Sequence, residues 1–160
     1  MVERGYRNTL NTDESDDITT SWGEWYRVQS QGIRGQRVEK FRRDCTDQHG
    51  RQVDKTFKWA PSLQELGVEL RELAPYLPKP IVGGTRTLVF CEGESDTDTV
   101  SALITDETVR AVGLQSGNWA PSKDWILRNC DLLESIILWP DHDKVGKAAM
   151  LKVSNLFIEL

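Results

Sequence analysis

The sequence predicts an α/β domain built on a parallel β-sheet and preceded by a small β-hairpin subdomain. Two short apolar runs, one beginning at Leu88 and one at Ile136, stop abruptly on carboxylates, and an apparent helix follows each of them. Continuous apolar runs bounded by turn formers are typical of strands buried on both faces of a parallel sheet. Strands then alternate with helices from residue 81 onward, which predicts a Rossmann-like sheet with helices on both faces.

The chain has 160 residues and a net charge of −5, enough for one domain with an appendage. No apolar run approaches membrane-spanning length and no signal-peptide core is visible, so we expect a cytoplasmic protein without a membrane partner. Cys45, Cys91 and Cys130 are widely spaced, which indicates packed or partly exposed reduced thiols rather than disulfides or a zinc site.

Charge is unevenly distributed along the chain. Residues 33–58 hold eight Lys and Arg against four Asp and Glu, whereas residues 88–160 hold six against twelve. A basic flank beside an acidic domain suits binding to a phosphodiester polymer. Charges that only decorate solvated faces would give the same pattern.

Residues 1–32 are predicted to be a flexible N-terminal segment, because the chain up to Ser21 is polar and acidic. Residues 33–80 form the hairpin and a connector. Strands over 38–46 and 52–59 flank a turn over 47–50 that ends on Gly50, and leucines between 63 and 77 indicate short helical turns broken by prolines. Residues 81–160 form the α/β domain.

Within this domain, Ser95 is the expected cap of a helix whose buried stripe is Val100, Leu103 and Ile104. A strand is expected over 108–114, a helix after Pro121 and a strand over 135–139. The final helix runs from Lys144, and one face carries its apolar residues. These are Val145, Ala149, Val153, Leu156, Phe157 and Leu160.

The acidic residues that follow the two apolar runs predict a metal site. Because parallel strands end at one edge of the sheet, the two acidic clusters should emerge together at the edge where open α/β sheets bind ligands. Carboxylates forced together repel unless a cation lies between them, and hard oxygen ligands favour Mg²⁺ or Mn²⁺.

Two motifs resemble a known family. The stretch Leu88-Val89-Phe90-Cys91-Glu92-Gly93-x-x-Asp96, followed by Asp141-x-Asp143-x-x-Gly146, resembles the Toprim domain of primases, topoisomerases, OLD-type nucleases and recombination proteins. Gly117 and Trp119 are similar to a Gly-Gly…Trp stretch of phage and plasmid primase-like members. The resemblance covers residues 88–160 well and 38–80 loosely.

The resemblance implies a role for each motif residue. Asp141 and Asp143 would hold Mg²⁺, Glu92 would be the general acid/base or a further metal ligand, and Asp96 would be a ligand or organise the loop. Helix N-capping by Asp143 and Asp96 is the simpler alternative. Phosphate contacts are expected from Gly93, Gly146, Lys144 and Lys147. Nucleic-acid contacts are expected from Arg42, Arg43, Lys55 and Lys58.

The implied function is that of a primase-like protein of phage or plasmid DNA replication, with Mg²⁺-dependent nucleotidyl transfer on single-stranded DNA. Nucleotides and a replicative helicase are the implied partners. An OLD-like nuclease and a non-catalytic DNA-binding or assembly module remain alternatives. A dehalogenase-like phosphatase also matches Asp141 to Val145, but its fold needs most of its domain downstream. Toprim folds usually continue into another strand, so we expect the final strand to be missing, either because the chain is a fragment or because a partner supplies that edge.

Overall fold

The structure is a computed structural model, and it describes residues 19–116, 119–130 and 132–159. The chain divides into two compact units. The smaller comprises the residues up to Glu24 together with 43–56, and the larger comprises residues 25–42 together with the chain from 57 onward. Within the described residues, no helix is long and apolar enough to cross a membrane.

The first four strands form an antiparallel sheet. They are β1 (Thr20–Trp22), β2 (Tyr26–Ile33), β3 (Gln36–Asp47) and β4 (Gln52–Ala60), in the order β1-β3-β2 with β4 also paired to β3. In the smaller unit the chain reverses after Asp47, whose N–H donates to the Arg51 carbonyl at 2.9 Å. Gly50 completes the turn with φ +75°, a conformation that favours glycine. The predicted hairpin is therefore confirmed.

Strand β2 corrects the expectation of flexibility through residue 32. In the larger unit β2 pairs with β3 from Tyr26 opposite Arg42 to Ile33 opposite Gln36, and β1 lies within the same N-terminal range. Backbone hydrogen bonds to β3 order this polar stretch, although it has few apolar side chains to bury. Residues 1–18 lie outside the described residues, and the boundaries at 32 and 80 stay predictions.

The connector after β4 packs on a small apolar core. Ile33 and Val38 lie there with Val68 and Leu73. Of the short helical turns predicted in this stretch, one is a 3-10 helix, η1 (Leu70–Glu72).

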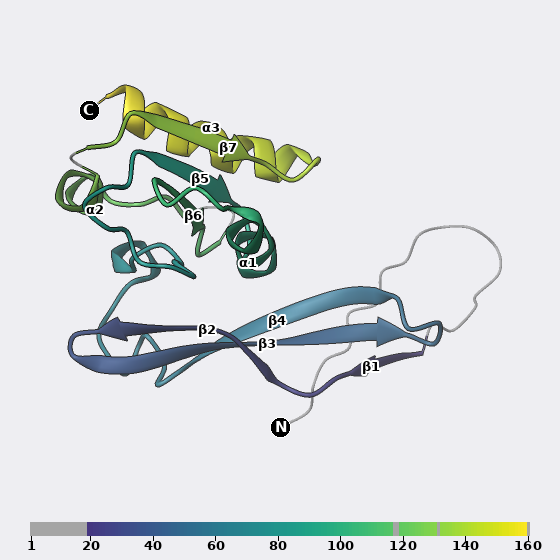
Figure 1. Cartoon of the computed structure of the whole chain (residues 1–160). Coiled ribbons are helices and arrows are strands. Elements are labelled where there is room, and N and C mark those ends of the chain that lie inside the picture. The colour runs from purple at the N-terminus through teal and green to yellow at the C-terminus, as the bar shows by residue number, and fades with distance from the viewer. Residues whose placement is uncertain (1–18, 117–118, 131, 160) are drawn as a thin grey trace. The chain divides into compact units, whose positions relative to one another are not determined.

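The second sheet is parallel, as predicted. It contains β5 (Thr87–Cys91), β6 (Val109–Gly113) and β7 (Ser135–Trp139), in the order β6-β5-β7. The helices are α1 (Glu94–Leu103), α2 (Lys123–Asn129) and α3 (Lys144–Ile158). Figure 1 shows α1 and α3 on opposite faces of this sheet.

The face under α3 carries the main apolar core. Leu88 and Phe90 of β5 pack there against Ala149, Met150 and Val153 of α3. Val145 was expected on this buried face but is 62% exposed. It lies one residue before Gly146, which turns toward the sheet edge, so Val145 faces away from the core.

The buried face of α1 is unexpectedly polar. Thr97 and Ser101 are the residues that α1 buries with Glu94, whereas Leu103 is 76% exposed. The helix approaches the sheet closely, since a Cβ atom at Gly113 would lie 2.6 Å from Thr97 Oγ1. Only small side chains fit there, so the predicted apolar stripe is wrong for Leu103, whereas Val100 and Ile104 are half-buried. The helix also begins two residues earlier than expected, with Gly93 rather than Ser95 at the N-cap.

Strand β7 is only partly buried. Ile137 is 47% exposed and Trp139 is 58% exposed. Among the described residues β7 pairs with β5 alone and forms one edge of the sheet, so the prediction that both apolar runs are buried on two faces holds for β5 and is wrong for β7.

Candidate functional site

Glu92 and Asp141 meet at the carboxyl edge of the parallel sheet. Cys91 pairs in register with Trp139, so the chain leaves β5 and β7 at the same level. The Asp141 N–H donates to Glu92 Oε1 at 3.0 Å, across 49 positions of sequence. The two acidic segments are therefore neighbours, which is the condition that a shared site requires.

Gly146 provides the space that Glu92 occupies. A Cβ atom at Gly146 would clash with Glu92 Oε1 and would lie 2.7 Å from Glu92 Cδ and 3.0 Å from the Asp141 nitrogen. The first turn of α3 thus packs directly on the Glu92 carboxylate. Any larger residue at position 146 would displace that carboxylate or the backbone at Asp141.

Asp143 is the N-cap of α3. Its Oδ1 accepts a hydrogen bond from the Gly146 N–H at 2.7 Å, which satisfies one of the donors that a helix start leaves unpaired. Asp143 therefore does cap the helix, as the alternative to metal binding proposed. Its second carboxylate oxygen is still able to bind a cation. Asp96 does not cap α1.

Electrostatic repulsion acts on Glu92. Its pKa is raised, first because burial penalises the charged form and then because Asp141, Asp143 and Asp96 are negative; the Asp141 N–H opposes this shift. The four carboxylates repel one another, and a bound cation would reduce this repulsion.

The acidic residues are not gathered into a ready coordination shell. Among the described residues, no three His, Cys, Asp or Glu side chains lie close enough together to hold an ion. The side chains of Asp96, Asp141 and Asp143 are exposed, and exposed carboxylates can change rotamer at small cost. Their hard oxygen atoms fit Mg²⁺ or Mn²⁺, which stays a prediction.

Two further acids of this segment have other partners. Glu94 points inward, and its Oε1 accepts from Lys40 Nζ at 2.6 Å. Asp98 accepts from the Tyr76 hydroxyl at 2.7 Å. Sequence reasoning missed the Lys40–Glu94 pair. A signal existed, because Lys40 shares the alternation of β3 with the buried Val38.

The predicted phosphate contacts lie around the start of α3 and α1. Lys144 and Lys147 are exposed in the first turn of α3, where the helix dipole and its N–H donors favour anions. Gly93 is the N-cap of α1 with φ −128°. A Cβ atom there would meet only Asp96 Oδ2, at 3.9 Å. Position 93 therefore has room for a side chain, whereas position 146 does not.

The four predicted nucleic-acid residues do not form one stripe. In the larger unit the Arg42 guanidinium lies 6.0 Å from the Phe57 ring centroid, whereas Lys58 lies 4.3 Å from that of Trp25. Because Phe57 and Lys58 are successive residues of β4, these two basic groups lie on opposite faces. In the smaller unit Arg43 lies 4.8 Å from the Trp22 ring and Lys55 is exposed.

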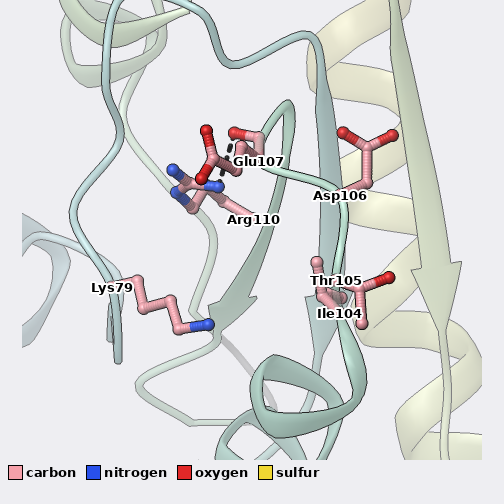
Figure 2. Close-up of a pocket in the computed structure, with 6 residues that line it drawn as sticks. All are labelled: Lys79, Ile104, Thr105, Asp106, Glu107 and Arg110. Atoms are coloured by element: carbon pink, nitrogen blue, oxygen red, sulfur yellow. Dashed lines mark hydrogen bonds between the residues drawn. The ribbon is translucent and has the colours of Figure 1, made fainter.

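A hollow of about 400 Å³ has a lining that includes neither Glu92 nor Asp141. It is formed by the loop from α1 to β6, at the amino end of the sheet, and is lined by Lys79, residues 104–107 and Arg110. Figure 2 shows the Arg110 side chain bonded to Glu107, and it also donates to the Pro80 carbonyl at 3.0 Å. Its guanidinium is thus committed to backbone carbonyls, so this hollow is not the candidate site.

No protein-family model matches the sequence, and no curated protein matches it. A solved structure is similar: that of the bacteriophage T7 lagging-strand DNA polymerase interacting with primase domains of two gp4 subunits bound to an RNA/DNA hybrid and dTTP. The sequence identity is 20% and the TM-score 0.45, and the likeness covers 78% of this chain and 62% of that chain. At these values the likeness assigns no family.

Proposed function

We propose that the chain carries out Mg²⁺- or Mn²⁺-dependent phosphoryl transfer on nucleic acid, as a primase-like protein that joins nucleotides on single-stranded DNA. The observation that supports this proposal most directly is the contact of Glu92 with Asp141 over Gly146. The carboxylate of Glu92, after β5, meets there the backbone N–H of Asp141, after β7, and the first turn of α3 at Gly146. Their types and order match the Toprim motifs in the sequence.

Each residue then has a chemical task. Asp141 and Asp143, with Asp96, would hold the divalent ion, which supplies neutralisation of phosphate charge and Lewis-acid activation. Glu92, whose pKa is raised by burial and by its acidic neighbours, is the group suited to take or return a proton at the reacting oxygen. The N–H groups at the start of α3, with Lys144 and Lys147, would orient a phosphate.

Single-stranded DNA and nucleotides are the ligands that this chemistry requires. Arg42, Arg43, Lys55 and Lys58 are the proposed contacts to the DNA backbone, because phosphate neutralisation by basic side chains dominates such binding. A replicative helicase as a further partner rests on the sequence resemblance alone.

A non-catalytic DNA-binding module is the second candidate. It is favoured by the capping role of Asp143 and by the absence, among the described residues, of three converging acidic or other ligand side chains. Such a module would bind DNA equally well with and without the metal. An OLD-like nuclease would use the same carboxylates for hydrolysis.

One set of assays separates these functions. The chain is incubated with single-stranded DNA, nucleotides and Mg²⁺ or Mn²⁺, and both primer synthesis and DNA cleavage are measured. Glu92→Gln and Asp141→Ala should each abolish metal-dependent transfer with an unchanged circular dichroism spectrum. Asp124→Ala, which removes an exposed acid of α2, is the matched control and should stay active. Full activity in both site variants would refute the assignment.

A further inference from the structure

A buried polar network joins the antiparallel strands to the start of α1. Its four side chains are Gln29 of β2, Lys40 of β3, Glu94 of α1 and Gln115 after β6, and they are between 3% and 9% exposed. All four belong to the larger unit. None of them was among the predicted site residues.

Each side-chain nitrogen of this network has an acceptor. Lys40 Nζ donates to Glu94 Oε1 at 2.6 Å and to the Gln115 carbonyl at 3.1 Å. Gln29 Nε2 donates to the same Glu94 oxygen and to Gln115 Oε1, each at 2.8 Å. Lys40 also lies 4.8 Å from the Phe57 ring centroid, so its ammonium is enclosed by acceptors and by an aromatic face.

Because Lys40 is buried, its stability depends on the Glu94 carboxylate pointing toward it. A buried ammonium without its carboxylate is strongly destabilising, whereas a pair replaced by apolar residues is often neutral. If Glu94 turned toward the acidic residues, Lys40 would lose its counter-charge. The pair therefore holds Glu94 inward, and with it the first residue of α1, two positions after Glu92.

We propose that Lys40, acting through Glu94 and supported by Gln29, is a positioning residue that fixes the start of α1 and thereby the placement of Glu92 against Asp141. This inference rests on the proposed function for its metal readout. It adds that strands outside the parallel sheet determine the geometry of the site. The ion pair with Lys40 also keeps the negative charge of Glu94 out of the acidic cluster, which already contains Glu92, Asp96, Asp141 and Asp143.

The test compares three variants of the full chain: Lys40→Met, the double variant Lys40→Met/Glu94→Met, and Arg27→Met. The double variant removes both buried charges and should keep the wild-type melting temperature even where Lys40→Met alone unfolds. Arg27→Met removes the exposed ion pair with Glu39 of the same two strands and is the matched control. Two quantities are measured: amide exchange of Thr97, which bonds to the Gly93 carbonyl at 3.0 Å, and affinity for Mn²⁺.

We expect the double variant to exchange the Thr97 amide about tenfold faster, as the loss of one charged hydrogen bond allows. We expect its Mn²⁺ affinity to fall about tenfold, as for other residues that orient metal ligands. The control should match the wild type in both. Wild-type Mn²⁺ affinity in the double variant would overturn the proposal. If the wild-type chain binds no Mn²⁺, the proposed function fails, and Thr97 exchange alone decides: faster exchange supports the positioning role, and unchanged exchange overturns it.

Discussion

Gly146 and Glu92 are in contact across the edge of the parallel sheet, and the carboxylate of Glu92 fills the space that a side chain at position 146 would need. This contact joins the first turn of α3 to the residue that follows β5. Glycine is unfavourable within a helix, so the space that Glu92 requires is the reason for a glycine at this position of α3.

Gly146→Ala should separate stability from activity. Alanine favours the helix by about 1 kcal/mol, but Glu92 must swing away and lose its hydrogen bond to the Asp141 N–H, so the melting temperature should change little. Metal-dependent transfer should fall at least as far as in Glu92→Gln, because the carboxylate is displaced. Gly84→Ala, at a position where a Cβ atom meets nothing within 4 Å, is the control. An active Gly146→Ala variant would contradict the role given to this contact.

Lys55→Ala should weaken binding of single-stranded DNA in a salt-dependent way. If Lys55 neutralises one phosphate, the slope of log affinity against log salt should decrease in magnitude by about 0.7. Fluorescence anisotropy at several salt concentrations measures this slope. Lys123→Ala, which removes a lysine of α2 paired with Glu159 at 3.3 Å, should leave it unchanged. Equal slopes for all three proteins would exclude Lys55 from the DNA contact.

The cysteines should differ in reactivity. Burial, and then the negative charge of Asp96, raises the pKa of Cys91 to about 11, so its thiolate is scarce at pH 8. Cys45 is also buried, whereas Cys130 is half-buried. A disulfide reagent should modify one thiol quickly in the native chain and three after unfolding, and Cys130→Ser should remove the fast reaction. Fast loss of two thiols would show that Cys91 or Cys45 is accessible.

Asp47 should stabilise the hairpin turn above pH 4. Its pKa is lowered chiefly by the Arg51 N–H, with further contributions from the His49 N–H and the Arg51 side chain. A lowered pKa in the folded state adds stability above the unfolded value, about 3.9, and this stability is lost as the pH falls through the folded value.

The Asp47→Asn variant tests this pH dependence. It should melt below the wild type at pH 7, and the difference should shrink as the pH falls toward 3. Thermal unfolding followed at several pH values measures both effects. A difference that is constant with pH would show that the charge of Asp47 is not responsible.

Much of the larger unit was predictable because its signals are local. Strand β7 spans the predicted residues, and α3 begins at Lys144 as expected, since an apolar run followed by Asp143 contains both the strand and the helix cap. Burial was harder to predict. Leu103 and Val145 have apolar side chains at plausible helical spacing, yet both are exposed, because the small residues Thr97 and Gly146 make the close contacts instead.

The candidate site was predicted in part for the same reason. Two acidic motifs at two strand ends are visible in the sequence, and parallel pairing brings Glu92 beside Asp141. The inward turn of Glu94 was not visible, because it depends on Lys40, which lies 54 positions earlier. An acid between Glu92 and Asp96 looks like a further ligand until its buried partner is known.

By itself the sequence determined where β7 and α3 begin and which acids follow β5 and β7, because caps, turns and apolar runs act over a few residues. Only the tertiary structure decided which acids face each other. Strand order β6-β5-β7 sets Asp141 against Glu92, and the buried charge of Lys40 draws Glu94 away from them. Both effects join residues far apart in the chain, where packing and desolvation outweigh local preference.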